Sequence, residues 1–513
     1  MMALHNSPIR LVNTLHLEAN MDFINRNKEL AALRRAAEEG RSQLIVIYGK
    51  RRVGKTALVK EFAKDLPHIY FLADKTPDRD QLAQLSEKVA LHFQDDFLLS
   101  RGFGTWQDFF KYIRSKVDLP RSPSVPVSQP QSTAQTIAAA PSASGAPAPQ
   151  PTPAAAQLVI IFDEFPYLIE SNPAIPSLFQ KGWDEELSSA GVFLILLGSS
   201  MGMMETEVLG HKSPLFGRRT GQILVQPLSF TDARPFFPAL SDDTFMHWYG
   251  ILGGTPAYLL QFDPAVDFRE NIRRRILAPE AYLYREPDFI LREELREPRN
   301  YFAILRAVSM GKTRPAEIIN ETGFDKNMVG KYLSVLTDLK IIRREVPVTE
   351  WGFEKSKKGL YLLEDPFFRF WFRYVYPNRS FIEEGEIDYL LDRKILPSLD
   401  RFISWSFEEV CRARVRGGIP QGIRFNRVGR WWSKEGEIDI LGLNDDESAA
   451  LFGEAKWSVN PVGDDILENL ERKARLVDWR KAERKDYFVL FSRSGFTENL
   501  HKRAREQRNL FLL

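Results

Sequence analysis

The sequence predicts a multidomain α/β protein, and three observations lead to this fold class. The chain has 513 residues, whereas a single hydrophobic core stops growing at about 250–300 residues, so two or three domains are expected. Near the N-terminus, LIVIYGKRRVGKTALVKEF joins an apolar strand, a glycine-rich loop and a helix. Near the C-terminus, GEIDILGLNDDESAALFGEAKW reads as two strands joined by a short acidic turn.

The composition excludes several classes of protein. Lys and Arg number 70 against 68 Asp and Glu, which leaves a net charge of +2, so overall charge neither requires nor excludes a nucleic-acid partner. The single cysteine, Cys411, excludes an internal disulfide and a multi-cysteine zinc cluster, and we expect it to be a buried helical residue. The chain has no run of about 18 uncharged apolar residues and no secretory signal, which predicts a cytoplasmic protein without membrane contact.

A phosphate-binding loop is expected between the first apolar strand, at 44–48, and the helix that follows it. Its glycines allow a tight turn, so that backbone N–H groups point at phosphate oxygens, and the helix adds its positive end. Lys55 would reach the β- and γ-phosphates, and Thr56 would ligate Mg²⁺. The residues expected to bind ATP are Gly49, Lys50, Arg51, Arg52, Val53, Gly54, Lys55 and Thr56.

Two acidic residues follow a second apolar strand, at 158–162, in LVIIFDEF. We expect Asp163 to hold Mg²⁺ through water or through Thr56. Glu164 is the candidate catalytic residue, because it would polarise the attacking water. The alternative is that both acids only cap the next helix.

A third apolar strand, GVFLILLGSS, ends at Ser199 and Ser200, where a hydroxyl group would sense the γ-phosphate. Arg218 and Arg219, in SPLFGRRT, are candidates for an arginine that stabilises the transition state. A surface position without a catalytic role is the alternative for both arginines.

A segment rich in Pro, Ala, Ser and Gln occupies residues 118–157. Its few apolar side chains do not offset the entropy of ordering, so we expect a disordered loop inserted within the domain. A spacer and a contact for a protein partner are both open roles.

Together with FINRNKELAALRRA, LVQPLSF and GGTPAYL, these motifs resemble the archaeal ATPase family, a branch of the signal-transduction (STAND) ATPases of the AAA-related P-loop class. The resemblance covers residues 22–280. It implies a P-loop NTPase parallel sheet with a helical lid that contains Gly254 and Pro256, and a segment at 23–26 beside the adenine. Because the match begins beside Met21, translation is expected to start there, and residues 1–21 form an N-terminal extension.

Residues 281–355 predict a winged helix-turn-helix. Helical periodicity occurs in YFAILRAVSMG, in PAEIINETGF and in DKNMVGKYLSVLTDLKII, and an extended IIRREVPVTE follows. The third helix would expose Asp325, Lys326, Asn327 and Lys331, the face that enters the major groove in DNA-binding examples. The alternative is an internal clamp on the nucleotide domain, because this face carries only two lysines and one acid.

Residues 356–513 form the last predicted domain. Its aromatic-rich start, YLLEDPFFRFWFRYVYPN, repeats aromatic residues at helical spacing, which favours core packing over base stacking. This stretch resembles the start of a domain commonly fused to archaeal ATPases and similar to PD-(D/E)xK nucleases. The resemblance implies a restriction-endonuclease-like α/β fold.

The acidic strands predict a second metal site. Alternation in a strand puts Glu437 on the same face as Asp439, and Glu454 on the same face as Lys456. If the strands pair, Asp439 and Glu454 would hold Mg²⁺ or Mn²⁺, and Lys456 would orient or help deprotonate a water that attacks a phosphodiester. Further candidates are the carbonyl of Ala455, Glu408 in a preceding helix with Glu409 as its alternative, and a phosphate-binding surface of Arg424, Arg427 and Arg430 interleaved with Phe425, Trp431 and Trp432.

The predicted function is an ATP-dependent switch that controls cleavage of nucleic acid, with DNA as the expected substrate and an oligomer or a protein partner as further candidates. In the alternative, the chain is a regulator whose C-terminal domain binds a DNA or protein partner but does not cleave. A peptide-remodelling motor is disfavoured because no substrate-threading loop is recognisable in the sequence.

Overall fold

The computed structural model describes residues 23–117, 157–295, 297–350, 356–419 and 422–513. The N-terminal extension and nearly all of the 118–157 insertion lie outside the described residues. The chain divides into two compact units: the first runs to Lys50 and from Lys55 to Val225, and the second contains Arg51–Gly54 and Gln226–Leu513. Each unit is described by itself.

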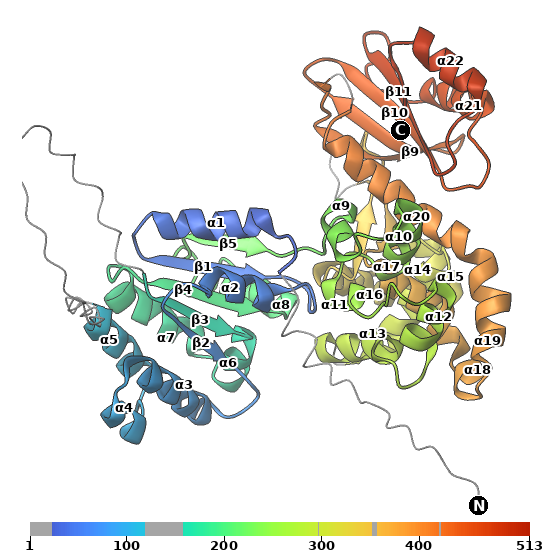
Figure 1. The fold of residues 1–513 in the computed structure, drawn as a ribbon. Helices are drawn as coiled ribbons and strands as arrows, with labels where there is room; N and C mark the ends of the chain where they lie inside the picture. Colours follow the sequence, from blue (N-terminus) through green and yellow to red (C-terminus); the bar gives the residue numbers. More distant parts are fainter. Residues whose placement is uncertain (1–22, 118–156, 296, 351–355, 420–421) are drawn as a thin grey trace, which may run out of the picture. The chain divides into compact units, whose positions relative to one another are not determined.

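A five-stranded sheet forms the centre of the first unit (Figure 1). Its strands are β1 (Gln43–Tyr48), β2 (His68–Leu72), β3 (Val159–Asp163), β4 (Phe193–Gly198) and β5 (Gly221–Leu224). They follow the order β2-β3-β4-β1-β5, and all neighbouring pairs are parallel. β1, β3 and β4 are the three strands predicted from the sequence, and they are buried along their whole length, as strands between two helical layers should be.

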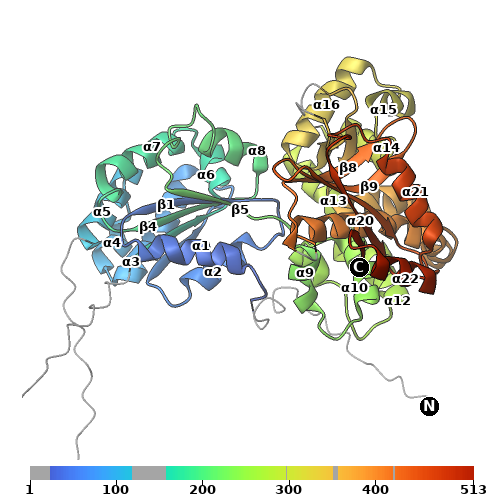
Figure 2. The same ribbon diagram turned by 90° about the horizontal axis from the view of Figure 1, so that it is seen from above.

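Helices cover both faces of this sheet, with α1 and α2 on one face and α6 and α7 on the other (Figure 2). Because β4 lies between β1 and β3, the carboxyl ends of these strands form one continuous edge. The helices of this unit are α1 (Asn27–Glu38), α2 (Lys55–Ala63), α3 (Asp78–Phe93), α4 (Asp96–Arg101), α5 (Trp106–Val117), α6 (Phe165–Ser171), α7 (Ile175–Gly182) and α8 (Met201–Met203), with π-helical turns η2 (Trp183–Leu187) and η3 (Met204–Val208).

The second unit begins with helices that the sequence assigned to the lid of the ATPase domain. They are α9 (Phe230–Ala233), α10 (Asp242–Leu252), α11 (Pro256–Leu259) and α12 (Phe268–Ile272), with the 3₁₀ turn η4 (Arg234–Phe236) and the π-helical turn η5 (Arg273–Leu277). The next helix, α13 (Tyr282–Glu294), lies in the segment that the sequence assigned to the winged helix. Residues 226–280 therefore cluster with the rest of the chain rather than with the parallel sheet. At the start of α11, Gly254 is required by close packing, since a Cβ there would lie 1.7 Å from the carbonyl oxygen of Leu228.

Three helices and a hairpin follow. They are α14 (Pro298–Ser309), α15 (Pro315–Thr322) and α16 (Lys326–Asp338), then β6 (Ile342–Glu345) and β7 (Leu360–Leu363), which pair antiparallel. The three helices expected at these places are confirmed. Gly323 ends α15 with a left-handed φ of 70°. The second strand of the hairpin lies beyond residue 355, the expected end of this segment.

An aromatic core joins these helices to the next ones. Phe367, Phe370, Trp371 and Tyr374 are all buried, and Trp371 Nε1 donates a hydrogen bond to the carbonyl oxygen of Tyr284 at 2.6 Å. The prediction of core packing for this stretch is confirmed. The elements here are α17 (Pro366–Phe370), η7 (Trp371–Val375), η8 (Tyr376–Asn378), α18 (Arg379–Glu383), α19 (Ile387–Leu390), η9 (Leu391–Ile395) and α20 (Leu396–Arg416).

A second five-stranded sheet, of mixed direction, ends the chain. Its elements are β8 (Arg427–Trp432), β9 (Glu437–Asn444), β10 (Ala449–Lys456), α21 (Asp464–Ala474), β11 (Lys485–Ser492), α22 (Glu498–Glu506) and β12 (Leu510–Leu512). The order is β12-β11-β10-β9-β8, with β8, β9 and β10 antiparallel and β10, β11 and β12 parallel. The long helix α20 packs on one face, where Cys411 is buried as expected, and α21 and α22 pack on the other.

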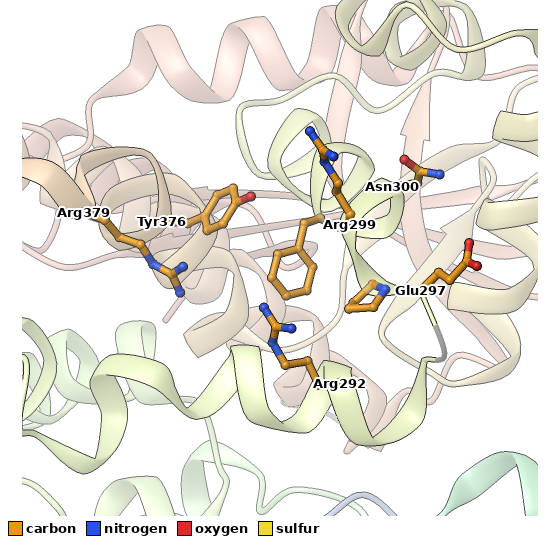
Figure 3. Close-up of a pocket in the computed structure, with 8 residues that line it drawn as sticks. Arg292, Glu297, Arg299, Asn300, Tyr376 and Arg379 are labelled. Carbon is orange, nitrogen blue, oxygen red and sulfur yellow. The ribbon is translucent and has the colours of Figure 1, made fainter.

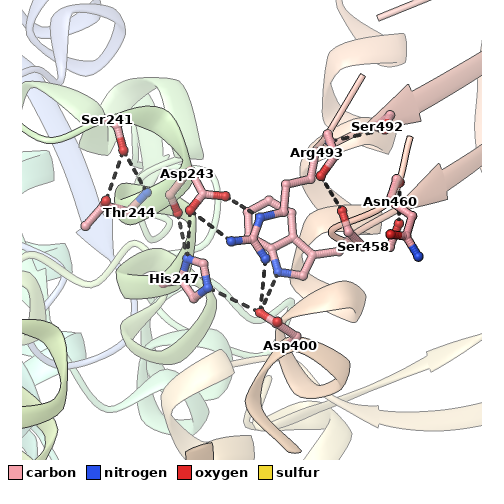
Figure 4. A network of polar contacts seen from close by, with 11 residues as sticks. Ser241, Asp243, Thr244, His247, Asp400, Ser458, Asn460, Ser492 and Arg493 are labelled. Atoms are coloured by element: carbon pink, nitrogen blue, oxygen red, sulfur yellow. Dashed lines mark hydrogen bonds and ion pairs between the residues drawn. The ribbon is translucent and has the colours of Figure 1, made fainter. Parts of the chain in front are cut away.

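The hairpin and the helices after the ATPase sheet both contact this C-terminal sheet. Val348 N donates to the carbonyl oxygen of Arg430 at 2.9 Å, so the chain after β6 lies along β8. Trp457 Nε1, directly after β10, donates to Asp400 Oδ1 at 3.2 Å. The same oxygen lies 3.2 Å from His247 Nε2 on α10 (Figure 4). No helix among the described residues has the length and apolar character needed to cross a membrane.

Candidate functional sites

The loop between β1 and α2 has the backbone geometry expected for phosphate binding. Gly49 has a φ of 154° and Gly54 a φ of 91°, and a Cβ on Gly49 would lie 2.3 Å from the carbonyl oxygen of Val225. Lys55 is buried, and its Nζ donates to the carbonyl oxygens of Gly49 and Lys50, both at 3.0 Å. The ammonium group is thus held over the loop, where incoming phosphate oxygens would compete with these carbonyls.

The tip of the loop, Arg51–Gly54, clusters with the second unit. Arg51 Nε lies 3.1 Å from Glu293, and Arg52 Nε lies 2.9 Å from Glu286. Val53 is fully buried. The two arginine side chains are therefore engaged by carboxylates in this structure.

Asp163 and Thr56 meet at the carboxyl edge of the parallel sheet. Thr56 Oγ1 donates to Asp163 Oδ2 at 2.7 Å, so the two side chains that the sequence assigns to Mg²⁺ are adjacent. A hydroxyl and a carboxylate are the hard oxygen ligands that suit this ion. The phenol of Tyr70 on β2 donates to the same Oδ2 at 2.6 Å, and burial together with this bond raises the pKa of Tyr70.

Glu164 and Ser199 are brought together by the adjacent strands β3 and β4. Ser199 Oγ lies 2.6 Å and 2.7 Å from the two carboxylate oxygens of Glu164. Glu164 has a left-handed φ of 52°, a conformation that is uncommon for residues other than glycine. The candidate γ-phosphate sensor therefore holds the candidate catalytic carboxylate.

The two candidate arginines after β4 have partners within the first unit. Arg218 Nη2 lies 3.1 Å from Asp184 Oδ2. Arg219 Nη1 donates to the carbonyl oxygen of Leu209 at 3.3 Å. These contacts fit the alternative of surface arginines.

The acidic strands near the C-terminus pair as expected. β9 and β10 are antiparallel, with Ile440 opposite Gly453, and one further step along this register brings Asp439 opposite Glu454. Ala455 N donates to Asp439 Oδ2 at 3.1 Å. Burial, and then the charge of Glu454, raises the pKa of Asp439 to about 6.

Two lysines hold the carboxylate of Glu454. Lys456 Nζ lies 2.6 Å from its Oε1, and Lys473 Nζ on α21 lies 3.2 Å from its Oε2. Glu454 is buried, which strengthens both ion pairs. Sequence reasoning identified Lys456 but missed Lys473, and the amphipathic pattern of α21 was the one available signal for it.

The structure distinguishes the two glutamates of α20. Burial of Glu409 is outweighed by Arg412 and Arg343, which lower its pKa to about 2. Glu408 instead faces Asp439, and its burial and that negative charge raise its pKa to about 8. Arg412, missed from the sequence, also donates to the backbone carbonyl of Asp439 at 2.7 Å. Glu408 is therefore the glutamate that lies near the acidic strands.

The donors at this second site are hard oxygens, the type that Mg²⁺ and Mn²⁺ prefer. Yet the part of the chain that the structure describes holds no group of three or more His, Cys, Asp or Glu side chains placed to bind a metal ion together. A metal at Asp439 and Glu454 would have to compete with the two lysines for the second carboxylate.

Two of the three arginines expected to bind phosphate, Arg427 and Arg430, lie on β8. Arg427 pairs with Asp445 at 2.8 Å, and Arg430 pairs with Glu437. The three aromatic residues interleaved with the arginines, Phe425, Trp431 and Trp432, are buried. β8 is an edge strand of the sheet, and these two arginines pair with carboxylates of the same unit.

The third helix of the three-helix segment exposes Lys326, Asn327 and Lys331. Asp325 caps α16, since its carboxylate accepts from the N–H groups of Asn327 and Met328 at 2.8 Å and 3.0 Å. Asp325 is exposed as well, so the face has the four residues that the sequence placed on it, and the carboxylate of Asp325 is used to cap the helix.

Two protein-family models match separate parts of the chain. A model described as an ATPase domain predominantly from Archaea matches residues 23–262. A second, described as archaeal and bacterial proteins of unknown function, matches residues 371–472. The predicted ATPase family and the domain fused to it are confirmed, and the likeness of that domain to nucleases stays a prediction.

Similar chains include uncharacterized protein MJECL04 of Methanocaldococcus jannaschii, which is 32% identical over 462 residues, 89% of this chain and 92% of that protein. Among solved structures, the Walker-type ATPase of Pyrococcus abyssi is 19% identical, with a TM-score of 0.46, over 68% of this chain and 96% of its own. The Aeropyrum pernix ORC2 protein is 13% identical, with a TM-score of 0.40, over 74% and 97%.

Proposed function

The chain belongs to the archaeal ATPase family, and on that premise we propose that it is an ATP-dependent switch that controls cleavage of nucleic acid by its C-terminal α/β domain. The ATPase domain supplies the nucleotide-dependent part. Lys55 and Thr56 would bind the phosphates and Mg²⁺ together with Asp163, and Glu164 would act in hydrolysis.

The observation that supports cleavage is the gathering of Asp439, Glu454 and Lys456 on two paired strands, beside Glu408. Two carboxylates and a lysine at this spacing suit a divalent ion and a phosphodiester substrate. The order of elements around them, a long helix, three antiparallel strands, a helix and a parallel strand, agrees with the restriction-endonuclease-like fold proposed for this domain.

Control by nucleotide is supported by the contacts behind the site. Trp457, directly after Lys456, shares Asp400 with His247 of α10. α10 follows the ATPase sheet in the chain, so a nucleotide-dependent shift of α10 would reach the end of β10 through Asp400. A switch of this kind needs ATP to favour one arrangement by a few kcal/mol.

The experiment is cleavage of plasmid, linear duplex and single-stranded DNA with Mg²⁺ or Mn²⁺, with and without ATP. Cleavage should be lost in the Asp439→Ala, Glu454→Ala double variant and in Lys456→Ala. Asp446→Ala is the matched control, because this exposed acid lies in the turn at the far end of the same two strands. Cleavage that survives the double variant would remove the assignment.

The second candidate function is a regulator that binds DNA or a protein partner without cleavage. The two lysines on Glu454 favour it, because they neutralise a carboxylate that a nuclease would give to its metal. The exposed Lys326, Asn327 and Lys331 of α16, in a winged-helix reading, would then carry the contact with DNA. Retained DNA binding with no cleavage under any condition tested would favour this candidate.

A further inference from the structure

A pocket of about 570 Å³ lies in the second unit, outside both sites described above. It is formed where the end of α13 meets the start of α14 and the turn between η8 and α18. Its volume falls within the range of about 300–1,000 Å³ that is usual for small-molecule sites. The chemistry of its walls indicates which class of ligand it would accept.

Positive charge is in excess around this pocket. Arg292, Arg299 and Arg379 line it. The buried carboxylate of Asp288 accepts from Arg292 Nε at 2.7 Å and from Arg379 Nη2 at 3.4 Å, while Arg285 lies 3.9 Å from it. Three guanidinium groups therefore share one carboxylate, and a second anion would be attracted to them.

Two of the lining arginines have unused donors. Arg299 is exposed and makes no ion pair with any residue that the structure describes. The buried Nε of Arg379 has no hydrogen-bond partner among the described residues. Figure 3 shows the guanidinium groups of Arg292 and Arg379 turned toward the same space. Together with the N-terminal end of α14, these donors suit phosphate oxygens.

Aromatic side chains form the remaining wall. Phe302 and Tyr376 both line the pocket, with ring centroids 5.5 Å apart and ring planes at 88°. The hydroxyl of Tyr376 makes no hydrogen bond to a described residue, and Figure 3 shows this side chain beside Arg379. The guanidinium of Arg379 already lies over the ring of Tyr376, 5.2 Å from its centroid, so a planar base would meet the edge of this ring and its hydroxyl group.

The geometry points to a second phosphate site in this protein, one that binds a nucleotide unit with its phosphate among Arg292, Arg299 and Arg379 and its base against Tyr376. The inference requires neither the P-loop nor the acidic strands. A purely structural role, in which Arg292 and Arg379 connect α13 to α18, would explain their ion pairs with Asp288. It would not explain the unpaired Arg299 or the open volume beside it. The lining includes one acid, Glu297, which is exposed at the start of α14.

The test uses the full chain with Lys55→Ala, which removes phosphate binding at the P-loop. Thymidine 5′-monophosphate, a 5′-phosphorylated hexathymidylate and inorganic phosphate are titrated separately by calorimetry. The Arg292→Ala, Arg299→Ala variant in the same background should bind the nucleotide probes about 10- to 100-fold more weakly. Arg285→Ala is the matched control, since it also approaches Asp288 without lining the pocket, and affinity should change less than about twofold.

Lys55→Ala is compared with and without the two arginine substitutions, so that binding at this pocket is separated from binding elsewhere in the chain. Binding of the monophosphate alone identifies a free nucleotide as the ligand, whereas binding of the hexanucleotide alone identifies the end of a strand. Affinity for inorganic phosphate equal to that for both nucleotides would overturn the role of Tyr376. Binding that is absent, or that is the same with and without Arg292 and Arg299, would overturn the site.

Discussion

The ammonium group of Lys473 on α21 lies 3.2 Å from Oε2 of Glu454 on β10. This ion pair joins a helix to the strand that carries the candidate nuclease residues, and it neutralises one of the two proposed metal ligands together with Lys456. The role of Lys473 can be tested separately from that of Lys456.

Replacement of Lys473 by methionine should tighten Mn²⁺ binding at the acidic strands, because one competitor for Glu454 is removed. The expected gain is about tenfold, which corresponds to roughly 1.4 kcal/mol. The measurement is Mn²⁺ titration followed by electron paramagnetic resonance. Lys481→Met, at an exposed lysine of the same unit, should leave the affinity unchanged. Weaker Mn²⁺ binding in Lys473→Met would contradict a competing role.

Replacement of Glu164 by glutamine should lower ATP hydrolysis by about 100-fold or more, while ATP binding is retained. The reason is that Glu164 is the candidate base, and glutamine keeps its size. Ser199→Ala should have a smaller effect, since Ser199 orients the carboxylate. Steady-state hydrolysis and nucleotide titration measure the two quantities. Glu170→Gln, at an exposed position of α6, is the control, and an equal loss there would make the Glu164 result uninformative about catalysis.

Stability should fall as pH rises, in the presence of a metal chelator. Burial and Asp439 raise the pKa of Glu408 from 4.5 to about 8, against the opposing charges of Arg412 and Arg430 and with a further contribution from Glu437. Between these values the folded state holds a proton that the unfolded state has released. The contribution is present below pH 4.5 and is lost as pH rises through about 8.

Urea unfolding at pH 5, 6.5 and 8.5 measures this effect, which should be on the order of a few kcal/mol. Glu408→Gln, which cannot ionise, should flatten the dependence. A variant as pH-dependent as the unchanged protein would assign the effect to another group.

Replacement of Gly254 by alanine should destabilise the second unit by several kcal/mol, because the new Cβ would lie 1.7 Å from the Leu228 carbonyl oxygen. Gly330, inside α16, is the matched control. Nothing lies within 4 Å of its added Cβ, so Gly330→Ala should stabilise by about 0.5–1 kcal/mol. Thermal unfolding measures both. If Gly254→Ala left the thermal stability unchanged or raised it, the packing at Gly254 would be looser than described.

Replacement of Asp400 by alanine should separate cleavage from its control by ATP. Asp400 Oδ1 accepts from Trp457 and His247 and lies 3.3 Å from Arg493 Nη1. Without it, nucleotide would no longer change the cleavage rate, although cleavage itself persists. Asp392→Ala, which breaks a comparable ion pair with Arg269 elsewhere in the unit, should keep the response. Preserved ATP dependence in Asp400→Ala would exclude this route.

Local signals in the sequence were sufficient for the phosphate-binding loop, the three buried strands and the acidic hairpin. Each is encoded within about ten neighbouring residues, by apolar runs, glycines or strict alternation. The adjacency of Thr56 and Asp163, 107 residues apart in the chain, followed from the rule that parallel strands share a carboxyl edge.

The residues that the sequence did not reveal act across long separations without a motif. Lys473, Arg412 and Tyr70 each contact a candidate site residue from a neighbouring helix or strand, and apart from the amphipathic pattern of α21 nothing in their own segments marks them as functional. The arginines on β8 show how local charge can be read in more than one way. Charge next to aromatic residues resembles a nucleic-acid surface, but Arg427 and Arg430 find carboxylates within the fold.

The aromatic core around Trp371 bears on how this chain can have been assembled. The same buried cluster contains Leu228 from the segment before α9, Phe302 from α14 and Trp457 directly after β10. A segment cut out at a border drawn from sequence, such as residue 356, would expose this core on both sides of the cut. Recombination between relatives would therefore preserve folding where it exchanges the second unit as a whole. Through Trp457, the C-terminal sheet shares this core with the helices that precede it.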